Sequence, residues 1–304
     1  MPRLKTKVSK GRLLRSVRKQ RLKSITILPS LITILNGVCG FAALVLAANG
    51  LFAGAGYMVL LAMVADVLDG RLARMSRTTS SFGGQLDSLC DVISFGAAPA
   101  FLMLRILKHE VAGLVEPNLI FAFLQRFIWL SAAAYVSCAA IRLARFNVEN
   151  EEDESAHMSF IGLPSPAAAG VIVSLVIFHQ HTLLEMSAQS GRAHLILENV
   201  IIYALPFVML AVAMLMVSRI RYPHIVNLYI RGKKPFAHLI WLLLVIGLVV
   251  WSIQIALALI FCGFAASGFA KWFYYRLIHR KSILPTSVET ATSALRRTPD
   301  GAAE

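Results

Sequence analysis

The sequence predicts an all-α integral membrane protein with about eight transmembrane helices. Of its 304 residues, 57% are hydrophobic, and the mean hydropathy is +0.68. Charged residues make up 15% of the chain, compared with about a quarter in soluble domains. Several apolar runs also reach the about 20 residues that cross a bilayer as a helix. We therefore expect one helical membrane domain rather than a soluble protein.

Eight apolar runs are expected to form the spans: 27–48, 53–75, 85–107, 118–143, 162–181, 198–218, 236–253 and 255–275. The last two runs lie in one continuous apolar stretch of about 40 residues, which is too long for a single span and long enough for a tight hairpin. We expect its turn near Trp251–Gln254.

The positive charges predict the orientation of these spans. Residues 1–23 hold ten of the 30 lysines and arginines and no acid, which favours attraction to anionic lipid beside the first span over a nucleic-acid-binding arm. If the N-terminus is cytoplasmic, only four of the 30 fall on the far side: Arg105, Lys108, Arg126 and Arg192. Because cytoplasmic segments of membrane proteins are enriched in basic residues, we expect a multi-pass protein of the inner membrane with both termini in the cytoplasm.

Four aspartates stand out because residues 1–109 contain no other carboxylate: Asp66, Asp69, Asp87 and Asp91. The first two are three residues apart and the last two are four apart, so each pair shares one face of a helix. A Ser/Thr/Gly-rich stretch between the pairs is typical of a helix–helix turn. In an antiparallel hairpin, all four carboxylates then lie at one depth, two to three turns from the cytoplasmic loop.

Such a cluster needs positive charge, because a single aspartate in mid-bilayer costs about 2.5–3.5 kcal/mol. Oxygen ligands without nearby His or Cys favour Mg²⁺, Mn²⁺ or Ca²⁺ over zinc. Four carboxylates suit two bridged divalent ions, an arrangement used in phosphoryl transfer. Intramembrane carboxylates also mark ion paths, so a divalent-cation transporter is the alternative. The confinement of the acids to one membrane end argues against it.

Gly70 and Ala73 lie on the aspartate face of the same helix, one turn closer to the cytoplasm. Small residues there leave room for a ligand above the metals. The alternative is ordinary close packing between membrane helices.

The complete pattern is Asp66-x₂-Asp69-Gly70-x₂-Ala73-Arg74-x₈-Gly83-x₃-Asp87-x₃-Asp91. It resembles the signature of the CDP-alcohol phosphotransferases and fills every fixed position. The resemblance implies a six-helix catalytic core, a homodimer and two divalent metal ions, Mg²⁺ or Mn²⁺. It implies that Asp66, Asp69, Asp87 and Asp91 reach the metals, with Asp91 also the general base. It implies that Gly70, Ala73, Arg74 and Gly83 accommodate the CDP moiety.

Four further stretches are similar to the bacterial, membrane-embedded phosphatidylserine synthases: 28–41, 142–147, 160–170 and 218–223. This similarity implies CDP-diacylglycerol and L-serine as substrates, and phosphatidylserine and CMP as products. Ser30 departs from the pattern, which has asparagine at that position. Glycerol 3-phosphate, an inositol phosphate or choline remains an alternative acceptor.

Serine carries a carboxylate, and Arg142 and Arg145 are the candidates to bind it. The alternative is that both arginines only anchor their helix at the interface. The following run, 147–155, is expected to be a solvated cytoplasmic loop.

We divide the chain into four parts: a basic cytoplasmic segment at 1–24, a phosphotransferase core at 25–225, a transmembrane hairpin at 226–278 and a disordered tail at 279–304.

Overall fold

The structure is a computed structural model of the chain. It describes residues 29–76, 81–111, 119–152, 160–183, 192–218, 220–222, 247, 249 and 252–281. The expected basic N-terminal segment lies outside these residues. So does the expected tail apart from its first three positions, and so does the seventh span apart from Gly247, Val249, Ser252 and Ile253.

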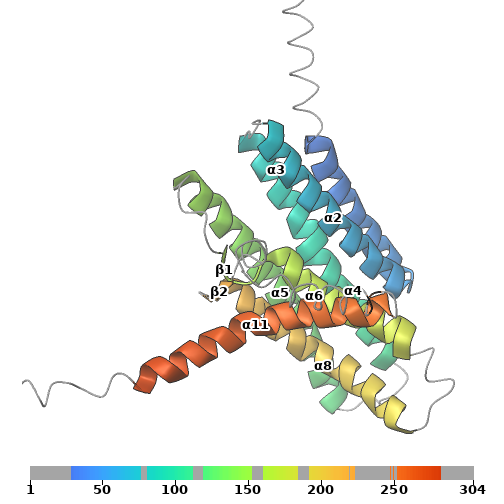
Figure 1. Cartoon of the computed structure of the whole chain (residues 1–304). Coiled ribbons are helices and arrows are strands. Elements are labelled where there is room, and N and C mark those ends of the chain that lie inside the picture. The colour runs from blue at the N-terminus through green and yellow to red at the C-terminus, as the bar shows by residue number, and fades with distance from the viewer. Residues whose placement is uncertain are drawn as a thin grey trace, which may run out of the picture.

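The described residues form a bundle of long helices (Figure 1). It begins with an N-terminal helix at Pro29–Ala48. The helices that follow are α2 (Phe52–Ser76), α3 (Ser81–Asp91), η1 (Val92–Ala97), α4 (Ala98–Val111), α5 (Leu119–Glu152), α6 (Ser165–Phe178), η2 (His179–Leu183), α8 (Arg192–Val217) and α11 (Ile253–Lys281). A two-residue strand β1 (Phe160–Ile161) pairs antiparallel with β2 (Arg221–Tyr222).

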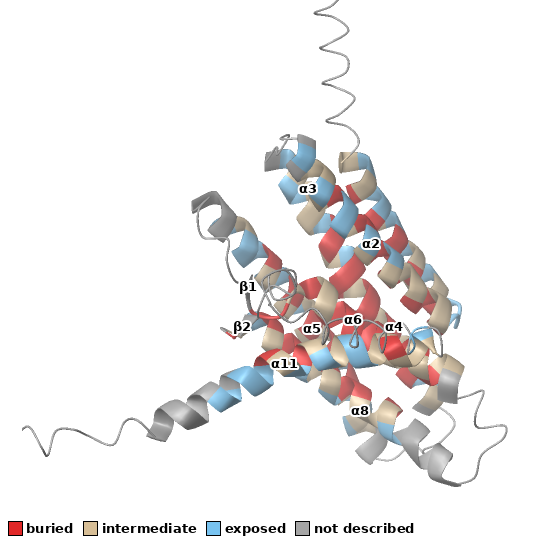
Figure 2. Ribbon diagram, viewed as in Figure 1, coloured by how far each residue is buried: buried red, intermediate tan, exposed pale blue. Residues whose placement is uncertain are grey.

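This architecture confirms the prediction of an all-α integral membrane protein. Six of the described helices are long and apolar enough to cross a membrane: Pro29–Ala48, Phe52–Ala73, Phe82–Glu110, Ala122–Val148, Val200–Val217 and Ile253–Lys271. The expected span at 162–181 is also helical, as α6 and η2, and most of α6 is buried inside the bundle. Figure 2 shows the buried residues concentrated where α4, α5 and α6 meet.

The prediction of a loop after the fourth span was wrong over the described residues 147–152. We expected the fourth span to end at 143 and a solvated loop to occupy 147–155, but α5 continues as helix to Glu152. The residues beyond the span include alanine, arginine and glutamate, which are good helix formers. The apolar pattern therefore marks where α5 leaves the membrane and not where the helix ends.

Small residues allow the helices that carry the aspartates to approach their neighbours closely. A methyl group added to Gly40 of the N-terminal helix would overlap Ser94 of η1, and one added to Gly56 of α2 would overlap Ile177 of α6. Close contacts of this kind are how membrane helices associate without a hydrophobic driving force. They fix the N-terminal helix and α2 against the centre of the bundle.

Helix α11 packs across α6, as Figure 1 shows. A methyl group added to Gly170 of α6 would overlap the ring of Phe261 of α11. The helix begins where we expected the hairpin turn, and the Ile255 amide donates a 3.4 Å hydrogen bond to the Ser252 hydroxyl. Hence α11, the second half of the expected hairpin, contacts the core directly.

Candidate active site

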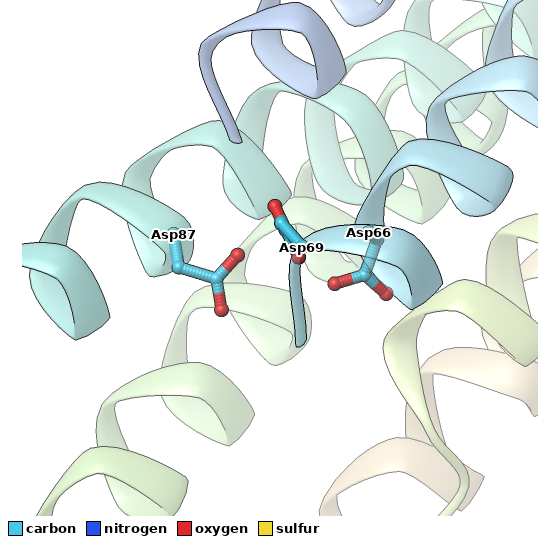
Figure 3. A group of neighbouring side chains, drawn as sticks. All are labelled: Asp66, Asp69 and Asp87. Atoms are coloured by element: carbon cyan, nitrogen blue, oxygen red, sulfur yellow. The ribbon is translucent and has the colours of Figure 1, made fainter. Parts of the chain in front are cut away.

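Three of the four aspartates converge between α2 and α3. Asp66 and Asp69 come from α2 and Asp87 from α3, and one carboxylate oxygen of each lies within 4.8 Å of the others. Figure 3 shows the three side chains pointing toward one another, with Asp69 between the other two in this view. The predicted helical spacing and the antiparallel hairpin therefore bring these residues together.

Within the described residues, two oxygens of this three-aspartate group are buried without a hydrogen-bond partner. Asp69 is 4% exposed, and neither its Oδ2 nor the Oδ1 of Asp87 has a hydrogen-bond partner among the described residues. Buried carboxylate oxygens are normally paired with a donor or a cation. An all-oxygen donor set with unused buried acceptors fits a hard divalent cation.

Asp91 lies outside the three-aspartate group but close to it. It is 7% exposed, and it interacts electrostatically with Asp66, Asp87 and Asp69. Its Oδ1 accepts a 2.9 Å hydrogen bond from the Nδ2 of Asn36, a fully buried residue of the N-terminal helix. Asp91 thus lies near the other aspartates, as the hairpin predicts. Unlike the unpartnered oxygens of that group, its Oδ1 already accepts a hydrogen bond from the protein.

A π-helical turn starts directly after Asp91. Within η1, Ser94 donates a 2.9 Å hydrogen bond to the main-chain oxygen of Asn36. The hydroxyl of Tyr135 on α5 donates to the main-chain oxygen of Phe95 at 2.9 Å. Such turns interrupt the regular helical hydrogen bonding and are frequent at functional sites. Here the turn connects the aspartate-bearing helix to two neighbours.

The four small or basic positions expected to accommodate CDP lie on the same two helices. A methyl group added to Gly70 would meet no atom of the described residues within 4 Å. Among the described residues, an added side-chain carbon at Gly70 would therefore disturb no helix contact, which disfavours the packing alternative at this position. Ala73 also lies on α2 and Gly83 on α3. Arg74 belongs to α2 too, but its side chain lies outside the described part of the structure.

The two candidate arginines on α5 differ. Arg142 is partly buried, interacts electrostatically with Asp91 and Asp66, and donates from Nη1 to the Ser165 hydroxyl at 2.6 Å. Arg145 is exposed. The structure thus places Arg142 beside the aspartates.

The sequence left several polar residues that support this site without an assigned role: Asn36 appeared only as a motif position, and Asn147 was compatible with orienting substrate or capping a helix. Besides Asn36, Tyr135 and Ser165, they include Ser88 and Asn147, whose side chains form hydrogen bonds of 2.9 and 3.0 Å between α3 and α5. Ser88 follows Asp87 directly. For Asn36 and Tyr135 the available signal was a polar residue inside an apolar run, where a buried polar group needs a partner.

Comparison with known proteins identifies the protein family to which the chain belongs. A model of the CDP-alcohol phosphatidyltransferase family matches residues 26–217, which is more than half of the chain and includes all four aspartates. The chain therefore belongs to the CDP-alcohol phosphatidyltransferase family, and it is a transferase. The matched region ends at the last residue of α8, so α11 lies outside it.

Within this family, the chain is similar to enzymes named for the transfer to serine and to an archaetidylserine synthase. The chain is 32% identical over 203 residues to a CDP-diacylglycerol–serine O-phosphatidyltransferase of Helicobacter pylori, covering 67% of this chain and 74% of that protein. It is 32% identical over 208 residues to an archaetidylserine synthase of Methanothermobacter thermautotrophicus, covering 68% and 73%. A CDP-diacylglycerol–serine O-phosphatidyltransferase of Methanocaldococcus jannaschii is 34% identical over 152 residues, covering 50% and 61%.

Proposed function

We propose that this protein transfers the phosphatidyl group of CDP-diacylglycerol to the hydroxyl of L-serine, forming phosphatidylserine and CMP. The observation that carries the reaction class is the three-aspartate group, in which two buried carboxylate oxygens lack a protein partner in the part of the chain that the structure describes. The choice of serine is supported by the names of the relatives, which include serine O-phosphatidyltransferases, and by Arg142, a cation beside the aspartates. Among the alternative acceptors, choline carries no anionic group for that arginine.

Asp66, Asp69 and Asp87 would hold the divalent ions, with Asp91 within reach of them. Two Mg²⁺ or Mn²⁺ ions would neutralise the charge that develops on the CMP oxygen during the transfer. The residues themselves supply a fixed set of acceptors, because α2 and α3 are held in place by close helix contacts. Gly70 leaves open space on the same face of α2, and we assign that space, with Ala73, Arg74 and Gly83, to the CDP moiety.

Asp91 is the proposed general base. Asn36 donates to Oδ1 of Asp91, which stabilises its ionised form and leaves Oδ2 to accept a proton. Oδ2 would take the proton of the serine hydroxyl as its oxygen attacks the phosphorus bonded to diacylglycerol. The phosphorus–oxygen bond to CMP breaks in the same displacement, and CMP leaves with that oxygen. This mechanism forms no covalent intermediate with the protein.

The identity of the acceptor is tested directly. Purified protein is supplied with CDP-diacylglycerol and Mn²⁺ or Mg²⁺, then with serine, glycerol 3-phosphate, inositol phosphate or choline in separate reactions, and CMP is measured. We expect CMP release with serine. Release only with another alcohol would disprove the acceptor and keep the reaction class. No release with any alcohol, together with metal flux into liposomes, would favour the transporter.

We further propose that the site faces the cytoplasm of the cell, in its inner membrane. The basic residues support this orientation, because 26 of the 30 fall on that side or at the adjoining helix ends. A membrane-impermeant thiol reagent applied outside should label a cysteine introduced at Asn49 and leave one introduced in residues 1–23 unlabelled. The opposite labelling pattern would reverse the orientation.

Family membership also suggests a homodimer. Light scattering of the detergent-solubilised protein should give twice the 33.3 kDa chain mass, after correction for detergent. A single chain mass at micromolar concentration would contradict the dimer.

A further inference from the structure

The loop before α6 is attached to the end of α8 through main-chain hydrogen bonds. The amide of Gly162 donates to the Ile220 oxygen at 2.8 Å, and the amide of Leu163 donates to the Leu215 oxygen at 3.1 Å. Gly162 has φ +83°, and a methyl group there would overlap the main-chain oxygen of Met216. Because only glycine combines this conformation with this approach, the backbone that leads into α6 has a fixed position.

Ser165 is the first residue of α6 and is fully buried, at 0% exposure. Its hydroxyl accepts the 2.6 Å hydrogen bond from Nη1 of Arg142. The backbone around Arg142 is also held in place, because hydrogen bonds anchor α5 before and after this residue. Before it, the Tyr135 hydroxyl donates to the main-chain oxygen of Phe95, and after it, the Asn147 side chain donates to the Ser88 hydroxyl. The Arg142–Ser165 contact therefore joins two backbones that are each held independently.

Arg142 lies near the aspartates, but among the described residues it is not directly ion-paired with them. Arg142 interacts electrostatically with Asp91 and Asp66, yet among the described residues no ion pair within 4.0 Å joins it to either one. A guanidinium that paired with these carboxylates would compete with the cations they are proposed to hold. The Nε of Arg142 is buried and has no hydrogen-bond partner within the described part of the chain.

We propose that Ser165 is a positioning residue for the acceptor, orienting the Arg142 guanidinium so that its unused N–H groups bind the acceptor's carboxylate. This inference rests on the proposed function. A guanidinium binds a carboxylate through a planar fork of N–H groups, so its orientation determines whether two bonds can form. Ser165 takes one amino group and leaves the buried Nε available. The residue thereby contributes to the choice of a carboxylate-bearing alcohol.

The test is a steady-state comparison of Ser165→Ala with Ser174→Ala. Ser174 is the matched control, because it is also fully buried in α6 and its one hydrogen bond among the described residues is the one its hydroxyl donates to the Val171 oxygen of the same helix. In Ser165→Ala we expect KM for serine to rise about tenfold, the effect of losing one hydrogen bond to a charged group. KM for CDP-diacylglycerol should stay within twofold of wild type. Ser174→Ala should change neither constant.

A second pair of variants covers a failure of Ser165→Ala to fold. Ser165→Thr and Ser165→Val have nearly the same shape and differ in the hydroxyl. Threonine should give the lower KM for serine, by about tenfold. Equal serine KM values in this pair, or a wild-type serine KM in Ser165→Ala, would overturn the positioning role. A wild-type protein that releases no CMP with serine would instead overturn the proposed function.

Discussion

Two regions of the site differ in the buried carboxylate oxygens that they leave without a protein donor, although Asp69 also accepts hydrogen bonds from Thr33 and the Gly70 amide. In the three-aspartate group, Asp69 Oδ2 and Asp87 Oδ1 have no hydrogen-bond partner among the described residues. Asp91 instead accepts a hydrogen bond from Asn36, whose own main-chain oxygen is bonded by Ser94. Unpartnered buried oxygens suit a cation that arrives from outside, whereas a protein donor fixes the carboxylate in one orientation. The comparison supports the proposal that the three-aspartate group mainly binds metal and that Asp91 mainly accepts a proton.

The largest effect is expected at Asp91. Asp91→Asn keeps the shape and the oxygen that accepts from Asn36, but the amide cannot take a proton. Turnover should fall by about 10²–10⁴-fold, the usual contribution of a general base, with an unchanged melting temperature. The measurement is CMP release at saturating substrates. Turnover within threefold of wild type would remove Asp91 as the base.

Asn36→Ala probes the same region one step further out. It leaves Asp91 in place but removes the buried donor of its hydrogen bond. The loss of this bond should lower the free energy of unfolding by about 1–3 kcal/mol, and kcat should fall about tenfold or more. Mn²⁺ binding by the three-aspartate group should not change. Ser137→Ala is the control, because within the described part of the chain its exposed hydroxyl forms a hydrogen bond only to Ala133 of α5. An unchanged kcat would show that the Asn36 hydrogen bond does not serve catalysis.

A pair of glycines distinguishes space kept for a ligand from space needed for packing. Gly70→Leu should raise KM for CDP-diacylglycerol about tenfold, as a loss of about 1.4 kcal/mol of binding, without lowering the melting temperature. Gly40→Ala should instead lower the melting temperature and leave KM for CDP-diacylglycerol unchanged. The added methyl overlaps Ser94, and such overpacking lowers the free energy of unfolding by about 1–3 kcal/mol. Both constants are measured for both variants. A melting temperature lowered equally in the two would mean that Gly70 is also a packing residue.

The smallest expected effect is at the contact between α6 and α11. Gly170→Ala forces the Phe261 ring to move, which should destabilise the protein by about 1–3 kcal/mol with little change in either KM. Gly263→Ala is the control, because no atom of the described residues lies within 4 Å of a methyl there. If Gly170→Ala melts at the wild-type temperature, α11 does not stabilise the core through this contact.

The sequence predicted the helical class and the meeting of Asp66, Asp69 and Asp87, because helical spacing and an antiparallel hairpin determine both. It could not predict the partners of Asp91 or Arg142. Asn36 and Ser165 lie 55 and 23 residues away from them, and such contacts depend on how separate helices pack. The extension of α5 was missed for a different reason, since hydropathy detects the membrane boundary and not the end of a helix.

Mn²⁺ binding, measured by electron paramagnetic resonance on wild type, Asp69→Asn and Asp91→Asn, tests the central comparison most directly. The wild-type protein should bind two ions. Asp69→Asn should lose both Mn²⁺ binding and CMP release, because it removes the middle carboxylate of the three-aspartate group. Asp91→Asn should lose CMP release while it still binds Mn²⁺. Full Mn²⁺ binding and turnover in Asp69→Asn would contradict the account.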